Sequence, residues 1–159
     1  MTFPASHTFY KKTSALQINL MKPKPEETSG VNGKTISKLK PGAILLEIAK
    51  ANGSKSYDWE NKAMISLSPQ EISSIEVSRL TQSGKVSIFH DPGKGTANEG
   101  KITRSLTIER TKNNDGYFFN LTEKNNGAIR NCNSILNDEE YYLFRELLIG
   151  AIPSLYGWR

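Results

Sequence analysis

The chain has 159 residues, of which 36% are hydrophobic and 23% are charged, so it is long enough to close one core without disulfide or metal staples. Its single cysteine, Cys132, excludes a disulfide framework within the chain and a cysteine-rich zinc site. No apolar run approaches the roughly 20 residues that span a bilayer, and the N-terminus lacks the apolar core of a secretory signal. We therefore expect one soluble, intracellular domain over residues 1–159.

The net charge of +5 is unevenly distributed. Residues 1–130 hold 19 Lys and Arg against 12 Asp and Glu, whereas residues 131–159 hold two against four. The excess of basic residues in residues 1–130 favours a polyanionic partner such as nucleic acid. The alternative is that the lysines only solvate the surface, because many proteins of similar charge bind no polyanion.

Strand patterns dominate the first part of the chain. Residues 1–8 are expected to be a flexible N-terminus, and residues 12–20 alternate as a half-buried strand does. Residues 22–34 contain two prolines and two glycines without periodicity, which predicts a surface loop. Three further strands are predicted at residues 35–39, 43–51 and from Ser56 onward.

A helix is predicted half-way along the chain. Ser68 suits the N-cap, Pro69 the first helical position, and Glu71 completes a capping box. Ile72, Ile75 and Leu80 would share one face. Four more strands are then predicted at residues 85–91, 102–110, 116–124 and 129–136, with a tight turn at residues 113–116.

The chain ends in a second predicted helix, over residues 138–158. Asn137 or Asp138 would cap it, and Pro153 would kink it near its end. Its apolar stripe consists of Tyr141, Phe144, Leu148, Ile152 and Leu155. The fold class expected is α+β, in which four strands and a helix are followed by four more strands and a second helix.

No catalytic constellation is found. Residues 95–102, "GTANEGKI", nearly match a phosphate-binding P-loop, but Ile102 stands where a hydroxyl must bind magnesium and a strand follows in place of a helix. His90 and Asp91 are adjacent on a strand, so their side chains point to opposite faces and cannot act as a dyad. We expect no catalytic residue, no metal and no cofactor, and therefore no enzyme.

Aromatic residues on the predicted strands allow two interpretations. Tyr57 and Trp59 lie among charged neighbours, which suits the stacking of unpaired bases while cations hold phosphates. Packing in the core is the alternative for every one of these rings, and for Phe89 and Phe119 in particular. The aromatic residues concerned are Tyr57, Trp59, Phe89, Tyr117, Phe118 and Phe119.

Taken together, these motifs resemble the Whirly family of single-stranded DNA-binding proteins. The resemblance rests on "YDWENKAMISLSP" at residues 57–69, "FHDP" at 89–92, "GKITRSLTI" at 100–108, "GYFFNL" at 116–121 and "IPSLYGW" at 152–158. These five motifs occur in the family's order and cover nearly the whole chain, from Phe9 to Trp158.

The resemblance implies a fold of two four-stranded antiparallel sheets packed roughly perpendicular to each other and held by two helices. It also implies a homotetramer built through the helices, with residues 138–158 as the oligomerisation helix, and single-stranded DNA lying across the sheets of adjacent protomers with little sequence preference. Such a cyclic arrangement would multiply weak contacts through effective concentration.

The first-strand motif departs from the family pattern. The family has Lys-Gly-Lys-Ala-Ala-Leu after a tyrosine, whereas here Tyr10 is followed by "KKTSAL". Lys11 matches the first lysine, Thr13 replaces the second, and Lys12 would place its charge on the other face of the strand. The resemblance therefore does not extend to contacts or assemblies that need the second lysine.

The leading hypothesis is a non-enzymatic protein that binds single-stranded DNA in repair, replication or recombination, with a further role in transcription. Bases would stack on Tyr57, Trp59, Phe89 and Tyr117. The phosphate contacts would come from Lys11, Lys12, Lys38, Lys62, Lys101 and Arg104.

Two alternatives remain open. The same fold could bind or anneal single-stranded or guide RNA, in which case the 2′-hydroxyl would be used. A basic surface could instead meet acidic protein partners. The expected location is a mitochondrion, plastid or nucleus in a eukaryote, or the cytoplasm in a bacterium or phage.

Overall fold

The computed structural model describes residues 5–30, 33, 35–53 and 55–158. The first sheet is antiparallel, with the strand order β1-β2-β5-β6. Its strands are β1 (Ser6–Tyr10), β2 (Ser14–Met21), β5 (Ala43–Lys50) and β6 (Ala63–Leu67). Residues 6–8, expected to belong to a flexible terminus, therefore form part of a strand, while residues 1–4 lie outside the described residues. The strand predicted from Lys12 begins at Ser14, after a turn.

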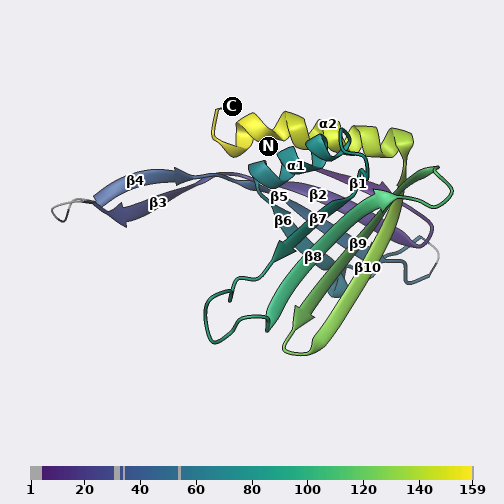
Figure 1. The fold of residues 1–159 in the computed structure, drawn as a ribbon, viewed down its shortest axis with the longest axis horizontal. Helices are drawn as coiled ribbons and strands as arrows, with labels where there is room; N and C mark the ends of the chain where they lie inside the picture. Colours follow the sequence, from purple (N-terminus) through teal and green to yellow (C-terminus); the bar gives the residue numbers. More distant parts are fainter. Residues whose placement is uncertain (1–4, 31–32, 34, 54, 159) are drawn as a thin grey trace.

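Between β2 and β5 the chain forms a two-stranded arm. Its second strand matches the strand predicted at residues 35–39, whereas its first strand lies where we expected a surface loop. Its strands, β3 (Lys24–Ser29) and β4 (Thr35–Lys40), pair antiparallel with each other and with no other strand of the described residues. Figure 1 shows the arm extending away from the body. Because neither face of the arm covers the core, its sequence has no need of the hydrophobic alternation by which buried strands are recognised. Pro25 is tolerated because a strand at an edge can lack a donor.

The helix α1 (Pro69–Ser78) begins as predicted. The Ser68 hydroxyl accepts from the Glu71 N–H at 3.2 Å, and the Glu71 carboxylate accepts from the Ser68 N–H at 3.0 Å. Ile72 and Ile75 are buried. Leu80 lies beyond the helix end and is 72% exposed, so its expected place on the apolar face is wrong.

The second sheet has the order β10-β9-β8-β7, and all its pairings are antiparallel. The strands are β7 (Val86–His90), β8 (Ile102–Arg110), β9 (Gly116–Asn125) and β10 (Ala128–Asn137), each close to its predicted bounds. The predicted turn joins β8 to β9, and Asn114 adopts a left-handed conformation there, with φ of 58°. The two four-stranded sheets cross at a steep angle (Figure 1), as the fold class predicted.

The helix α2 (Asp138–Leu155) starts with a second capping box, formed by Asn137 and Glu140. Its buried stripe packs on the second sheet, where Phe119 and Phe144 meet edge to face at 5.1 Å between ring centroids. Pro153 lies within the last turn of the helix. Figure 1 shows both helices on one side of the molecule, and no described helix is long and apolar enough to cross a membrane.

Candidate nucleic-acid interface

Three aromatic side chains meet at one end of the outer face of the first sheet. The ring centroids of Tyr10 and Tyr57 are 5.7 Å apart, and those of Tyr57 and Trp59 are 6.5 Å apart. The Tyr57 hydroxyl donates to the backbone carbonyl of Lys11 at 2.6 Å, which fixes its ring. Tyr10 is 67% exposed and Trp59 is half-buried. We call Tyr10, Tyr57 and Trp59 the aromatic cluster.

The backbone that carries this cluster differs from the strand predicted from Ser56. Tyr57 forms only an isolated bridge with Ala51, and Trp59–Asn61 form a 3₁₀ turn before β6 begins at Ala63. The Asn61 amide donates to the Asp58 carboxylate at 2.9 Å, which competes with strand pairing in this segment. The turn therefore presents Trp59 at the sheet rim and not in a strand.

The middle of this outer face is polar. Glu47 of β5 is 4% exposed, accepts from the Asn19 amide at 2.6 Å and forms an ion pair with Lys62. A buried carboxylate is stable only when it is paired and hydrogen-bonded, as here. Lys62, predicted to contact phosphate, is therefore neutralised within the protein, and its side chain keeps 32% exposure.

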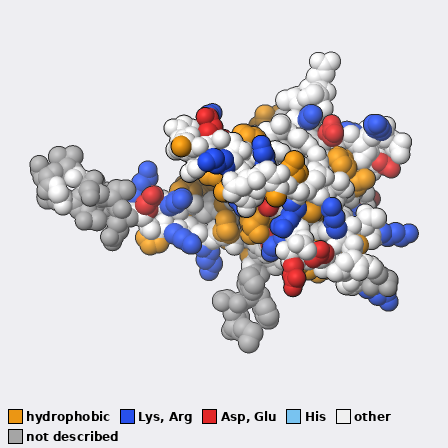
Figure 2. All heavy atoms as spheres, turned by 90° about the horizontal axis from the view of Figure 1, so that it is seen from below, with side chains coloured by type: hydrophobic (Ala, Val, Ile, Leu, Met, Phe, Trp, Pro, Cys, Tyr) orange, Lys and Arg blue, Asp and Glu red, His pale blue; other side chains and the backbone are white. Residues whose placement is uncertain are grey.

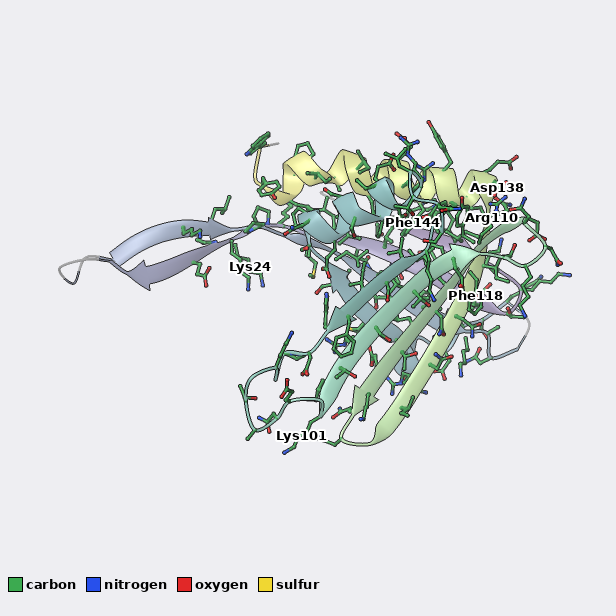
Figure 3. The ribbon with its side chains drawn as sticks, in the orientation of Figure 1. Lys24, Lys101, Arg110, Phe118, Asp138 and Phe144 are labelled. Atoms are coloured by element: carbon green, nitrogen blue, oxygen red, sulfur yellow. The ribbon has the colours of Figure 1, made fainter. Side chains whose placement is uncertain are left out.

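The other predicted cations fall into two groups. Lys11 pairs with Glu140 at 2.5 Å, and Arg104 lies 3.5 Å from Glu123. The second group is exposed and takes part in no ion pair within the described part of the chain: Lys12, Lys38 and Lys101. They lie on separate elements: Lys12 in the β1–β2 turn, Lys38 on the arm and Lys101 in the loop before β8. Figure 3 shows Lys101 at the end of the second sheet.

Phe89 and Tyr117 lie apart from the aromatic cluster. Phe89 is 63% exposed on the outer face of the second sheet. Tyr117 lies on the inner face, where its ring stacks on that of Tyr141 at 3.7 Å and the Arg110 guanidinium is 4.8 Å from its centroid. These contacts pack Tyr117, which is only partly buried, against α2, and its predicted role in stacking bases stays a prediction.

The outer face of the second sheet is rich in uncharged polar side chains, which the sequence reading missed. Alternation along β7 to β10 was visible, but the cross-strand register was not. Phe89 is aligned across the sheet with Ser105, Thr122 and Asn131. The Asn131 amide donates to the Thr122 hydroxyl at 2.7 Å. Such a surface offers donors and acceptors without charge.

The edge of the first sheet is covered by the second. The carboxylate of Glu123 accepts from the backbone N–H of Met64 in β6 at 2.6 Å. The guanidinium of Arg130 donates to the backbone carbonyl of Lys62 at 3.1 Å. The ends of β9 and β10 that adjoin their connecting turn are therefore bound to the sheet edge that carries the aromatic cluster.

His90 and Asp91 have separate structural partners. The His90 imidazole lies 2.7 Å from the Glu71 carboxylate, and Asp91 accepts from the N–H groups of Gly93 at 3.1 Å and Gly100 at 3.0 Å. Asp91 thus shapes the turn that was predicted to end the strand. No cluster of metal-ligating residues occurs within the described ranges.

Cationic and apolar side chains lie close together on one face of the molecule. Figure 2 shows this face, on which a few Asp and Glu side chains lie among the Lys, Arg and hydrophobic ones. A surface of this kind can stack planar apolar groups while it holds anions, which is the chemistry required for an unpaired nucleic-acid strand.

The chain is similar to known proteins that are named for binding single-stranded DNA. The profile of the family described as Whirly transcription factor matches residues 9–147. The chain is 34% identical over 167 residues to the single-stranded DNA-binding protein WHY3, chloroplastic, of Arabidopsis thaliana, covering 98% of this chain and 58% of that protein. It is 33% identical over 156 residues to WHY1, chloroplastic, of Zea mays, covering 96% of this chain and 56% of that one. The chain thus spans little more than half the length of these relatives.

Solved structures agree with the sequence comparison. The crystal structure of WHY3 from Arabidopsis thaliana superposes with a TM-score of 0.80 at 31% identity, covering 99% of this chain and 92% of that one. The structure of the plant transcriptional regulator PBF-2 gives a TM-score of 0.82 at 29% identity, covering 99% and 85%. The chain therefore belongs to the Whirly family.

Proposed function

We propose that this protein binds single-stranded DNA without catalysing a reaction, and that the aromatic cluster on the first sheet is the centre of its site. The observation that carries the proposal is the grouping of Tyr10, Tyr57 and Trp59 at a solvent-facing rim beside Lys12, in a member of this family. Relatives are named single-stranded DNA-binding proteins, which supports the same ligand here.

In this site, bases would stack on the cluster while lysines hold the backbone. Stacking is worth about 1 to 3 kcal/mol per base and tolerates any sequence, because every base has a π-face. Lys12 is free to reach a phosphate. Lys62 could do so only by sharing its charge with Glu47, so we expect it to contribute less than Lys12.

The helices support assembly into a homotetramer. Large apolar side chains remain exposed on the helical side of the single chain: Val77, Leu80, Tyr142, Leu143, Leu147 and Ile149. An exposed apolar surface of this kind marks a protein interface. A symmetric assembly through it would bring several copies of the aromatic cluster to one DNA strand. Phe89 and the polar outer face of the second sheet could then contact the same DNA strand.

The cellular role that follows is protection of exposed DNA strands and an influence on transcription. Relatives are named chloroplastic or, in the case of WHY2 of Arabidopsis thaliana, mitochondrial. We therefore propose an organelle that holds its own DNA as the place of action.

The test is a fluorescence-anisotropy titration with a mixed-sequence DNA strand of about 30 nucleotides, its duplex and its RNA counterpart. Trp59→Ala should weaken single-strand binding by about 5- to 150-fold for every sequence, because the loss of one stacked base costs about 1 to 3 kcal/mol. Trp158→Ala is the matched control, since Trp158 is 79% exposed at the chain end and is expected to leave affinity unchanged.

Each result has a definite meaning. Equal affinity of Trp59→Ala and the parent protein, with an intact fold, would assign Trp59 to packing. RNA binding as tight as DNA binding would replace DNA by RNA as the ligand. Absence of binding at low salt would overturn the proposed function.

A further inference from the structure

The root of the arm contains a hollow lined by three lysines. It has a volume of about 270 Å³, and Lys22, Lys24 and Lys40 are among the residues that line it. The remaining lining residues are Met21, Pro41, Gly42, Ala43 and Ser66. No acidic residue is among these lining residues, so the hollow, which we call the arm-root pocket, is suited to an anion. Figure 3 shows Lys24 at this root.

Two of the three lysines lie opposite each other in the strand register of the arm, so their charges repel. Lys24 and Lys40 are direct cross-strand partners, and both are exposed. Like charges in this position destabilise a strand pair. The next pair on the same face, Glu26 and Lys38, carries opposite charges. In the described part of the chain neither Lys24 nor Lys40 takes part in an ion pair, so a bound anion would relieve the repulsion.

The backbone around the pocket is held in place by contacts with α2 and β2. The N–H of Gly42 donates to the carbonyl of Leu155 at 2.8 Å, which ties the root of the arm to the end of α2. A Cβ at Gly42 would collide with the carbonyl oxygen of Met21, so only glycine allows the two segments to approach this closely. A pocket that is organised before binding loses less entropy when its ligand arrives.

Lys22 also lies near the C-terminal end of α2, where a lysine is favourable even when no ligand is bound. It also lines a hollow with Ser154 and Gly157, at the C-terminal end of α2. A cation there is stabilised by the helix dipole. Lys40 also lines a hollow that includes Glu71 and Tyr156, the C-cap residue of α2. Lys24, with Lys40 as its cross-strand partner, therefore carries the inference.

The pocket lies on the same sheet face as the aromatic cluster, at its other end. Met21, Ala43 and Ser66 occupy the alternating positions that continue the outer face. The six residue steps of β2 from Ala15, the partner of Tyr10, to Met21 separate the two sites by about 20 Å. We propose that the arm-root pocket is a second phosphate-binding site, and that it holds the backbone of the DNA strand whose bases stack on the aromatic cluster. The second half of this proposal rests on the proposed function.

The experiment compares two double variants with the same loss of charge. Lys24→Gln with Lys40→Gln removes the pocket's repelling pair, and Lys85→Gln with Lys112→Gln removes two exposed lysines elsewhere. Each lost contact between a lysine and a phosphate of a single strand flattens the plot of log K against log salt by about 0.7. The pocket variant should therefore lose about 1.4 from its slope and bind about 25-fold more weakly at 0.1 M salt if affinities converge at 1 M. The control should keep the parent slope.

Thermal unfolding separates a binding role from a structural one. At low salt the pocket variant should unfold at the same temperature as the parent protein or higher, because the repulsion is gone. Inorganic pyrophosphate should raise the unfolding temperature of the parent protein and of the control, but not that of the pocket variant.

The two proposals can fail separately. If the parent protein binds the DNA strand and both double variants show equal slopes, the arm-root pocket is not part of the DNA path. If no variant binds DNA, the proposed function fails, and a pyrophosphate effect confined to proteins with Lys24 and Lys40 would still support a phosphate site. The absence of that effect in the parent protein would overturn the pocket.

Discussion

Tyr141 is the residue whose acid–base chemistry the fold changes most. It is 5% exposed and lies between the rings of Tyr117 and Phe144. Burial raises the pKa of its phenol from 10.0 to about 12, because the charged phenolate would lose its hydration. The same packing partly buries Tyr117, a side chain predicted to stack bases, against the core of the molecule.

This shift predicts a pH-dependent loss of stability. Between pH 10 and 12 the folded protein keeps the Tyr141 proton while the unfolded chain releases it, so the free energy of unfolding falls as the pH rises. A shift of about two units corresponds to a loss of about 3 kcal/mol by pH 12. Tyr141→Phe should lack this part of the decline. Urea unfolding of both proteins at pH 9 and above measures it, and parallel pH profiles would contradict the burial of an ionisable phenol.

At the scale of elements, the start of α2 is where several parts of the chain are joined. The side chain of Asn137 accepts from the Glu140 N–H at 2.8 Å, while Glu140 also pairs with Lys11 from the β1–β2 turn. Arg110, at the end of β8, binds Asp138 in the first turn, and this hydrogen bond lowers the pKa of the Asp138 carboxyl. The helix is therefore fastened to both sheets where its dipole favours acids.

Removal of the cap tests this junction. Asn137→Ala should lower the free energy of unfolding by about 1 kcal/mol, since an unpaired N–H remains at the helix start. Asn133→Ala is the control, because Asn133 is exposed on β10 and its side chain makes no hydrogen bond within the described residues. Urea denaturation gives both values, and an equal effect of the two changes would show that the cap contributes nothing.

The elements that the sequence predicted well are those determined by local sequence patterns, such as helix caps and strand alternation. The Ser68 capping box, the cap at Asn137 as one of two candidates, and the strands of the second sheet follow from spacing alone. The strand at residues 35–39 was predicted, but its partner β3 was not, because a strand that buries no face shows no hydrophobic alternation. The turn at Trp59 was missed because Asp58 and Asn61 act through side-chain hydrogen bonds that compete with a strand.

The candidate site was predictable in its composition but not in its contacts. The sequence predicts Tyr57 and Trp59 as a pair, and the structure places them together. Charge alone points to Lys11, Lys62 and Arg104, and each lies against an acid that is distant in sequence. Such pairings depend on how the two sheets and α2 pack, which periodicity does not specify.

At the scale of the whole molecule, the exposed apolar side of α2 should determine the assembly. Leu143 and Leu147, four residues apart on one helical face, are 41% and 39% exposed. Leu143→Glu with Leu147→Glu should leave the monomer folded but abolish association. Analytical ultracentrifugation should give about four times 17.7 kDa for the parent protein and one times for the variant.

A matched change on a strand controls for the new charge. Ile135→Glu alters an exposed apolar residue of β10 and should keep the parent mass. If both proteins remain assembled, another surface holds the protomers together, and the apolar side chains of the helix have a different partner.

The contacts of Glu123 and Arg130 with β6 also bear on aggregation. A strand at the border of a sheet offers unpaired backbone groups on which a strand of another molecule can form. Here those groups at Lys62 and Met64 are occupied by side chains of the second sheet. The protein can therefore keep an apolar strand such as "AMISL" at the border of its first sheet without inviting the growth of intermolecular β-structure there.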